Sequence, residues 1–553
     1  MNISKTLANI LCNRGILSPS DAENFLSPRL AGLRDPFEIP GIIEAAKRVL
    51  LARERGEKVL VYGDYDVDGV TGTSILVQTF KLLGIDCSYY IPHRYGEGYS
   101  LSLDSVKKIA ETGVKLLVTV DCGIGSAIEV EEANALGMDV VITDHHNLPR
   151  QLPKAVAIVN PKQIKGEHPS KYLSGAGVAF KFAWALLRTA GIKDSLFLTS
   201  LLDLASLGTI SDVVPLTGEN RILAVGGLNL INERKRLGIK QLADSAALRG
   251  KIGVNQIYFA IAPRINAAGR LEHASKSVDL LLTEDPQAAK EMAEELNRIN
   301  SKRQSLGSRI KEEVFDQIDA DLVEGSKLVF MTGQDWHPGV IGIVASQVAD
   351  IYFRPTILIG INEGVGRGSA RSIDGFNIYE LLDSCRELFL DFGGHEGAAG
   401  FEIKLENVPE LKVRLTREIE NQINQETLVP RITIDSEIEL SQLSLGMVSD
   451  LDRLQPFGEG NPQPVFMLCD LQLADYKTVG AEGKHLKAWF TKEGVKLETI
   501  GFGMGKMANN LNYKSSYDLA FNLDSNEYNG FESVQLSLVD IRQKELTPKP
   551  PLL

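Results

Sequence analysis

Six aspartates and two adjacent histidines are the residues of this chain whose types and spacing best suit chemistry. They are Asp64, Asp66, Asp68, Asp121, Asp144, His145, His146 and Asp203. Carboxylate oxygens and imidazole nitrogens form a ligand set that suits divalent ions such as Mn²⁺, and a carboxylate shared by two ions allows a two-metal hydrolysis of phosphoesters. These residues therefore predict a metal-dependent phosphodiesterase.

The elements expected to position these residues are strands of a buried parallel sheet. Apolar, β-branched runs over residues 58–62, 116–120 and 139–143 end next to Asp64, Asp121 and Asp144, as in strands that are buried on both faces. Helical patterns at 72–83 and 126–136 lie between them, which predicts a doubly wound α/β sheet. Ligands in such sheets bind beyond the carboxyl ends of the strands. We therefore expect the acidic stretches to converge on one edge of the sheet.

Each stretch also has a simpler interpretation. The Asp-x-Asp-x-Asp-Gly of residues 64–69 resembles part of a calcium loop, but the glutamate expected further on in an EF-hand is missing and a strand precedes it. An aspartate after a strand is commonly a helix cap, and a pair of histidines is often a surface or core feature. The combination favours a metal site, because chance does not place every acidic stretch at the end of a strand.

Asp203 is included because of its surroundings, the apolar segment 200–216. A buried carboxylate without a partner is costly enough to take up a proton, and a metal ion is a natural partner for it. Asp212 precedes an apolar run and is equally well explained as a turn residue, so it receives no ligand role.

Composition limits the class of protein. The 553 residues exceed what one hydrophobic core usually supports, and 44% hydrophobic and 24% charged residues are typical of globular domains. The absence of a long apolar run and of a secretory segment predicts a cytoplasmic protein without membrane contact. The five cysteines show no zinc spacing. A net charge of -13 argues against indiscriminate coating of nucleic acid, but not against an enzyme with a local basic channel.

Patterning along the chain predicts several units. They are an N-terminal cap on the catalytic domain (1–45), the catalytic α/β domain (46–250), a connector with a long helix (251–325), a glycine-rich domain (326–425), a β-barrel (427–545) and a tail (546–553). Asp285 as N-cap and Pro286 at the first helical position begin the long helix, which runs towards Ile318.

The last two domains carry signals for nucleic acid. Glycine-rich stretches at 364–372 and 393–400 expose backbone N–H groups beside arginines, which favours binding of a phosphate backbone. The short strands of the C-terminal region predict an OB-like barrel, a fold that binds single strands. Aromatic residues that fit either base stacking or the barrel core are Trp489, Phe490, Tyr528 and Phe531.

The Asp-His-His of residues 144–146 resembles the signature of the DHH phosphoesterase superfamily, and the chain is most similar to its RecJ group of single-strand-specific exonucleases. The stretches that carry this resemblance are 62–69, 204–216, 262–271, 393–400 and 454–462. The resemblance covers nearly the whole chain. It implies a multidomain α/β protein: a DHH domain with a doubly wound, mostly parallel sheet, a long helix, a DHH-associated α/β domain and a C-terminal OB-like barrel.

The resemblance also implies a site for two divalent ions, with Mn²⁺ expected and Mg²⁺ as the alternative. Asp121 would bridge the two ions, and the other implied ligands are Asp64, Asp66, Asp68, His145 and Asp203. Asp64 would either bind directly or support the site, because Tyr62 stands where many relatives carry a histidine ligand. As catalytic residues beside Asp121, Asp144 would orient the site and His146 would contact the scissile phosphate.

Members of the RecJ group degrade single-stranded DNA from its 5′ end to mononucleotides, so the resemblance implies this activity and a role in DNA repair and recombination. Arginines suit the pocket for the 5′-phosphate, because their fork donates two hydrogen bonds to one phosphate. The implied nucleic-acid contacts are Arg94, Arg264, Asn266, Arg270, Arg367, Ser369, Arg371 and His395. The expected partners are a single strand with a free 5′ end, a single-strand-binding protein and a helicase, and a monomer is expected.

Two alternatives stay open at this point. Another DHH enzyme, such as a pyrophosphatase or a phosphodiesterase for oligoribonucleotides or cyclic dinucleotides, would typically lack the terminal barrel. A non-catalytic replication scaffold would have lost metal ligands. The strand-rich region 427–545 and the intact acidic set favour the nuclease.

Overall fold

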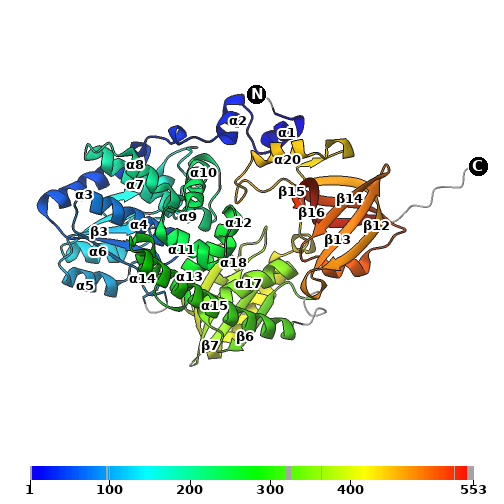
Figure 1. Ribbon diagram of the computed structural model, residues 1–553. Helices are drawn as coiled ribbons and strands as arrows, with labels where there is room; N and C mark the ends of the chain where they lie inside the picture. Colours follow the sequence, from blue (N-terminus) through cyan, green and yellow to red (C-terminus); the bar gives the residue numbers. More distant parts are fainter. Residues whose placement is uncertain are drawn as a thin grey trace, which may run out of the picture.

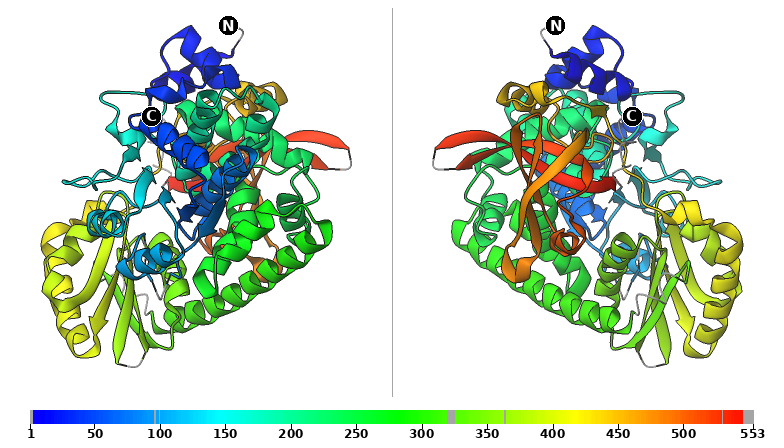
Figure 2. Two further views of the ribbon diagram at one scale, coloured as in Figure 1. Left: turned by 90° about the vertical axis from the view of Figure 1, so that its left-hand side faces the viewer. Right: turned by 90° about the vertical axis from the view of Figure 1, so that its right-hand side faces the viewer.

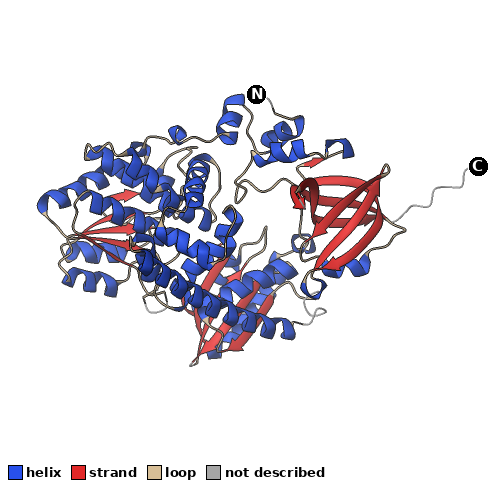
Figure 3. Cartoon of the chain, viewed as in Figure 1, coloured by secondary structure: helices blue, strands red, loops and turns tan. Residues whose placement is uncertain are grey.

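The computed structural model describes residues 3–94, 97–98, 100–318, 325–362, 364–528 and 530–544. The predicted tail at 546–553 and the side chain of Tyr528 lie outside the described part. The structure has the predicted multidomain α/β organisation, with three sheets in three separate places (Figure 3). In Figure 1 the first sheet and its helices lie on the left, the barrel on the right and the second α/β domain below. Among the described helices, none is both long and apolar enough to span a membrane.

The first sheet is parallel throughout, in the order β2-β1-β3-β4-β5. Its strands are β1 (Val59–Gly63), β2 (Cys87–Tyr90), β3 (Leu116–Val120), β4 (Asp139–Thr143) and β5 (Ala157–Val159). The winding direction reverses between β1 and β3, and the loops beyond such a switch point leave a crevice for ligands. Asp64 directly follows β1 and Asp121 directly follows β3, so two of the predicted ligands lie at the switch point.

Helices cover both faces of this sheet. They are α3 (Ile42–Arg55), α4 (Val67–Leu82) and α7 (Gly175–Thr189) on one face, and α5 (Leu103–Glu111) and α6 (Ala127–Ala135) on the other. The next helices pack on these helices: α8 (Ser195–Ser200) and α9 (Leu202–Ser211) contact α7, and α10 (Gly218–Glu233) contacts α9. α11 (Leu237–Ser245) follows α10. Alternate residues of a strand point to opposite faces. Val61 therefore packs with the cluster that contains α3, α4 and α7, whereas Leu60 packs with α5 and α6. The strands are buried on both sides, which explains why they read as continuous apolar runs.

A helical connector links the catalytic region to the second α/β domain. It consists of α12 (Val254–Gln256), a π-helical turn (Ile257–Ile261), α13 (Ala262–Leu271), α14 (Ser275–Leu282) and α15 (Pro286–Gln317). The 32-residue α15 begins where predicted, with the Asp285 carboxylate accepting a hydrogen bond from the N–H of Gln287. Its first half packs against α11, α13 and α14, and Ile310 and Val314 near its end pack against α17. One continuous helix thus fixes the two α/β domains relative to each other.

The second α/β domain has a mixed sheet in the order β6-β7-β8-β10-β9, in which only β6 and β7 are parallel. Its elements are β6 (Val329–Gln334), α17 (Pro338–Tyr352), β7 (Thr356–Asn362), β8 (Val365–Arg371), α18 (Ile378–Asp383), β9 (Phe389–His395), β10 (Ala398–Lys404) and α19 (Val408–Gln422). α17 covers one face, and α18 and α19 cover the other. The two predicted glycine-rich stretches coincide with β8 and with the β9–β10 hairpin.

The C-terminal strands form a closed barrel. The elements are β11 (Ser436–Glu437), α20 (Leu445–Asp452), β12 (Phe466–Val479), β13 (His485–Lys492), β14 (Val495–Gly501), β15 (Ser516–Tyr528) and β16 (Phe531–Lys544). The order β12-β13-β14-β16-β15 closes through a further pairing of β12 with β15. Phe490 is fully buried against Tyr517 and belongs to the barrel core, whereas Phe531 is 80% exposed. Of these two aromatics, only Phe531 is available for stacking.

The N-terminal segment corrects one expectation. Residues Leu7 and Ile10 of α1 (Lys5–Asn13) belong to the core of the barrel domain and not to that of the catalytic domain. In the same segment, the N–H of Ser4 donates a hydrogen bond to the carboxylate of Asp450 in α20. Figure 2 shows α1 and α2 (Pro19–Leu26), in blue, beside the gold α20. The amphipathic pattern correctly indicated a buried face, but such a pattern does not reveal which distant part of the chain buries it. The predicted boundary at 45/46 also falls inside α3.

Candidate active site

The turn from β1 into α4 carries three of the predicted ligands. Asp66 is the N-cap of α4, and its carboxylate accepts hydrogen bonds from the N–H groups of Asp68 (2.9 Å) and Gly69 (3.2 Å). A side chain at Gly69 would place its Cβ 2.5 Å from the carbonyl oxygen of Asp64, so only glycine allows this tight turn. Asp64 Oδ1 is buried and accepts no hydrogen bond among the described residues. Asp66 therefore caps the helix, while the oxygen of Asp64 that accepts no hydrogen bond is left for a cation.

Asp68 lies in the first turn of α4 and faces the start of α7. Its buried carboxylate accepts hydrogen bonds from the N–H groups of Gly175 and Ala176. The positive end of the α7 dipole stabilises a carboxylate at this place. Burial, together with the charge of Asp66, nevertheless raises the pKa of Asp68 to about 7. This carboxyl group therefore holds a proton more readily than a free aspartate unless a cation approaches it.

Asp121 follows β3 in a left-handed backbone conformation, with φ of 62°. A Cβ at Gly175 would lie 2.7 Å from the Cβ of Asp121, so the glycine at the start of α7 allows the close approach. Asp121 Oδ1 lies 3.0 Å from His145 Nε2. Burial and the charge of Asp68 raise the pKa of Asp121 well above its usual value.

His145 brings two further carboxylates into the site. Its Nε2 lies 3.5 Å from Asp212 Oδ2 and 3.8 Å from Asp68 Oδ2. Burial lowers the pKa of His145 to about 3, so its imidazole is neutral and suited to ligate a metal. Burial and the charge of Asp68 raise the pKa of Asp212. The carboxylates are thus crowded together in a buried place, where their negative charges disfavour one another.

These contacts define groups of side chains that fit divalent ions. In each group the ligand atoms lie within 4.8 Å of one another: Asp64, Asp66 and Asp121; Asp68, His145 and Asp212; Asp121, His145 and His146. Two groups share Asp121, and two share His145. Carboxylate and imidazole donors, a buried acceptor at Asp64 and raised carboxyl pKa values are what a pair of divalent ions would complement. The residues present therefore fit the two ions implied by the sequence.

Asp203 does not lie with these residues. Its carboxylate, near the start of α9, forms an ion pair of 2.7 Å with Arg236 Nε, and it also accepts the N–H of Leu204. The inference that a buried acid needs a partner was sound, but the partner is an arginine from a later segment rather than a metal. Asp212, which had received no ligand role, caps the other end of α9 and takes the place expected for Asp203.

Asp144 orients the two histidines. Its Oδ1 accepts the N–H groups of His145 (2.7 Å) and His146 (3.0 Å) and lies 2.7 Å from His146 Nδ1, while its Oδ2 accepts the N–H of Ile124. Although burial opposes the charged forms, this pairing lowers the pKa of Asp144 and raises the pKa of His146. The His146 side chain is 44% exposed, so it can reach a bound substrate.

Three predicted phosphate ligands lie near this cluster. Arg94 lies over the ring of Tyr65, 4.8 Å from its centroid. Arg371, at the end of β8, is largely buried, and burial together with the charge of Arg94 lowers its pKa to about 10. Burial and the charges of Arg371 and His146 lower the pKa of His395 in the β9–β10 hairpin. Residues of both α/β domains therefore concentrate positive charge beside His146.

The other predicted nucleic-acid contacts differ in their partners. Ser369 Oγ accepts a hydrogen bond from Arg371, and Arg367 lies on the same face of β8 but pairs with Glu402 at 3.4 Å. The others make contacts within the protein: Asn266 accepts the N–H of Val67 in the aspartate turn, Arg264 donates to Asn297 of α15, and Arg270 donates to the carbonyl of Gly339 at the start of α17. These three residues join the connector to the site and to its neighbours.

Sequence reasoning missed Gly175 and Lys162 as well as Asp212. Asp212 carries the same signal as the predicted ligands, an acid at the end of an apolar element. Gly175 is recognisable only from its approach to Asp121. Lys162 Nζ donates to Asn147 Oδ1, and its positive charge lies near Asp144 and Asp212.

Comparisons with known proteins cover nearly the whole chain. The DHH family N-terminal domain is recognised over residues 58–209, the DHHA1 domain over 325–421 and the RecJ OB domain over 434–540. The single-stranded-DNA-specific exonuclease RecJ of Bacillus subtilis is 38% identical over 548 residues, which cover 99% of this chain and 69% of the relative. The protein of the same name from Haemophilus influenzae is 35% identical, with 93% of this chain and 92% of the relative covered.

The fold is also similar to solved structures of RecJ. The crystal structure of RecJ from Thermus thermophilus in complex with Mn²⁺ matches with a TM-score of 0.84 and 33% identity, over 98% of this chain and 76% of that chain. The Mg²⁺ complex of that protein matches with a TM-score of 0.78. The match extends through the catalytic region, the connector, the second α/β domain and the barrel.

Proposed function

The chain belongs to the RecJ family, and we propose that it is a metal-dependent exonuclease that hydrolyses single-stranded DNA from the 5′ end to 5′-mononucleotides. Its role would be in DNA repair and recombination. The observation that carries the proposal is the convergence of the metal-binding groups around Asp121 and His145 with the positive charges of Arg94 and Arg371. A site with both parts can hold a terminal phosphate beside the bond to be cleaved.

The residues that would hold two ions, with Mn²⁺ or Mg²⁺ as candidates, are Asp64, Asp66, Asp68, Asp121, His145 and Asp212. Such ions would activate the attacking water and stabilise the leaving 3′ oxygen. His146 would contact a non-bridging oxygen of the scissile phosphate, because Asp144 holds its Nδ1 and leaves Nε2 for the substrate. Asp144 is thus a positioning residue.

The direction of digestion would come from the second α/β domain. Arg371, Ser369 and His395 lie beside Arg94 and His146, where together they can bind a 5′-phosphate one nucleotide away from the cleaved bond. A guanidinium fork recognises such a dianion by paired hydrogen bonds. A strand that enters with a 3′ end has no terminal phosphate to offer these groups.

The barrel would hold the rest of the strand. On its outer surface the ring of Trp489 lies between 5.4 and 5.6 Å from the Nζ atoms of Lys477, Lys487 and Lys496. Trp489 is partly exposed, and its Nε1 donates to Glu498. Aromatic rings at a protein surface can stack on bases and lysines attract the backbone, a combination that suits single strands without regard to sequence. Binding to a single-strand-binding protein and a helicase belongs to the same proposal, as does a monomeric state.

The proposal is tested with a long single strand labelled at either end and incubated with Mn²⁺. We expect the 5′ label to leave at once as a mononucleotide and the 3′ label to stay on steadily shorter fragments, while a blunt duplex is left intact. Asp121→Ala, which removes a residue shared by two metal-binding groups, is the inactive control. Release of the 3′ label first, or hydrolysis of only pyrophosphate or dinucleotides, would overturn the proposal.

A further inference from the structure

A loop of the C-terminal domain contacts the segment that follows Asp212. We name residues 453–462, between α20 and β12, the clasp loop. Building on the proposed function, we propose that the clasp loop positions Asp212 in the metal centre and so couples the barrel domain to the catalytic site. Asn461 and Gly460 of the loop would be positioning residues, because they touch no reacting atom.

The backbone beside Asp212 is in an unfavourable conformation. α9 ends at Ser211, Asp212 is its C-cap, and Val213 has a φ of 60°. A β-branched residue rarely adopts this left-handed conformation. Strain of this kind persists only where surrounding contacts determine the local structure, and it is concentrated at functional sites. The direction of the Asp212 carboxylate therefore depends on what holds the next few residues.

The clasp loop supplies these contacts. The N–H of Leu216 donates a 2.7 Å hydrogen bond to the carbonyl oxygen of Glu459, and the Leu216 side chain is fully buried. A Cβ at Gly460, whose φ is 67°, would lie 2.9 Å from the Cβ of Pro215. Only glycine allows the loop to lie so close to residues 215–217. From the catalytic side, Asn220 Nδ2 donates to the carbonyl of Pro215 at 3.1 Å.

The clasp loop is itself held rigidly. Asn461 is fully buried, and its Nδ2 donates to the carbonyls of Leu454 and Pro456, both at 2.8 Å. Two arginines fix the loop from outside. Arg14 of the N-terminal segment donates to Asn461 Oδ1 and to the carbonyl of Pro462, and Arg221 of α10 donates to the carbonyl of Gln455 at 2.7 Å. The loop thus has a defined position against both the barrel domain and α10.

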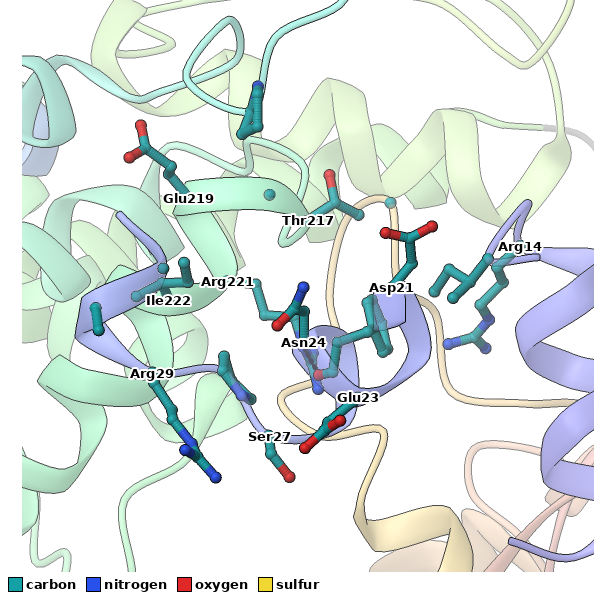
Figure 4. Close-up of a pocket in the computed structure, with 18 residues that line it drawn as sticks. Arg14, Asp21, Glu23, Asn24, Ser27, Arg29, Thr217, Glu219, Arg221 and Ile222 are labelled. Carbon is teal, nitrogen blue, oxygen red and sulfur yellow. Dashed lines mark hydrogen bonds between the residues drawn. The ribbon is translucent and has the colours of Figure 1, made fainter. Parts of the chain in front are cut away.

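These contacts meet at a cavity of about 780 Å³ between the N-terminal segment, α10 and the clasp loop, which Figure 4 shows with Arg14 and Arg221 on different walls. Arg221 also donates to the carbonyl of Phe25 and lies over its ring. The junction thus joins three segments that are far apart in sequence. Movement of the barrel domain would be transmitted through this junction to residues 215–217 and to Asp212.

The test compares two glycine substitutions in the full-length protein. Gly460→Ala adds a methyl group that collides with Pro215. Gly494→Ala, in the turn between β13 and β14, is the matched control: its φ of 79° carries the same conformational penalty, but no atom lies within 4 Å of the added Cβ. Each protein is titrated with Mn²⁺ by calorimetry and, in EDTA, with a fluorescent single-stranded oligonucleotide.

We expect Gly460→Ala to weaken Mn²⁺ binding by about 10-fold or more, in the range found for residues that orient metal ligands, with oligonucleotide affinity unchanged. Gly494→Ala should leave both affinities at the wild-type value. If Gly460→Ala lacks a cooperative thermal transition, Arg14→Ala decides, because it releases the loop without adding atoms; we then expect weaker Mn²⁺ binding in that variant.

Mn²⁺ isotherms of Gly460→Ala that superimpose on the wild type, or an equal loss in Gly494→Ala, would overturn the inference. The outcome is independent of the nuclease assay. A wild-type protein that binds Mn²⁺ but releases no mononucleotides would contradict the proposed function, whereas unchanged Mn²⁺ binding in the folded clasp-loop variants would contradict only this inference.

Discussion

Asp203 and Asp212 lie at opposite ends of α9, and only Asp212 approaches the imidazole of His145. An α-helix rises about 1.5 Å per residue, so their carboxylates are separated by more than two helical turns. Asp203 is neutralised by Arg236 instead, at 2.7 Å. The same apolar helix therefore carries one aspartate for stability and one for the candidate metal centre.

Substitution should separate these two roles. We expect Asp212→Ala to reduce the release of mononucleotides by about 100-fold or more, at or above the upper end of the range for residues that only orient ligands, with little change in unfolding by urea. Asp203→Ala should retain activity but lower the free energy of unfolding by about 2 kcal/mol. The mostly buried Arg236 would lose its ion-pair partner and keep hydrogen bonds only to neutral oxygens, such as those of Gln78 and Ser200. A large loss of activity in stably folded Asp203→Ala would contradict this assignment.

Arg371 should set the preference for a 5′-phosphate. We expect Arg371→Ala to reduce the ratio of kcat/KM on 5′-phosphorylated strands to that on 5′-hydroxyl strands by about 10-fold or more, the value of a charge-assisted hydrogen bond. Arg367→Ala is the matched control, because Arg367 lies on the same face of β8 but pairs with Glu402. Equal losses on both kinds of end in Arg371→Ala would remove the proposed role.

Asp144 should act through His146. The two carboxylate oxygens of Asp144 now interact with the N–H of His145, the ring of His146 and the N–H of Ile124. An asparagine would offer only one acceptor oxygen for these groups. We expect Asp144→Asn to lower kcat by about 10- to 100-fold, as is usual when a residue that orients a ligand or catalytic group is lost, with a small change in KM. Steady-state kinetics on a short single strand measures both values. A rise in KM at unchanged kcat would assign Asp144 to binding instead.

Metal and protons should compete for the site. The pKa of Asp68 is raised to about 7 in the folded protein without metal, whereas an unfolded aspartate titrates near about 3.9. Between these values the folded protein binds more protons, so the stability of the metal-free protein falls as pH rises. Metal ligation requires the ionised carboxylate. The increase in melting temperature caused by Mn²⁺ should therefore be larger at about pH 7.5 than at about pH 5.5.

Differential scanning fluorimetry with and without Mn²⁺ measures this difference directly. Asp121→Ala should show a much smaller increase at both pH values, because two of the metal-binding groups contain Asp121. An increase in wild-type melting temperature that is equal at both pH values, or larger at the acidic one, would contradict the competition.

The parallel sheet, the acidic residues at its strand ends and the long helix α15 could all be predicted from the amino-acid sequence. These features are local: each strand is a short apolar run, each acid directly follows its strand, and Asp285 with Pro286 begins the helix. Parallel strands end at one edge of their sheet, so local signals were sufficient to bring Asp64, Asp121 and Asp144 together.

Three features depended on contacts between distant parts of the chain: the choice between Asp203 and Asp212, the packing of α1 against the barrel, and the position of Arg371 near His395 and His146. Such contacts also place Phe490 in the barrel core and Leu216 under the clasp loop. The physical reason is the same in each case. Hydrophobic periodicity indicates that a side chain is buried, and a charged residue in an apolar segment indicates that its charge needs a partner. Neither pattern identifies a partner that lies far away in the sequence.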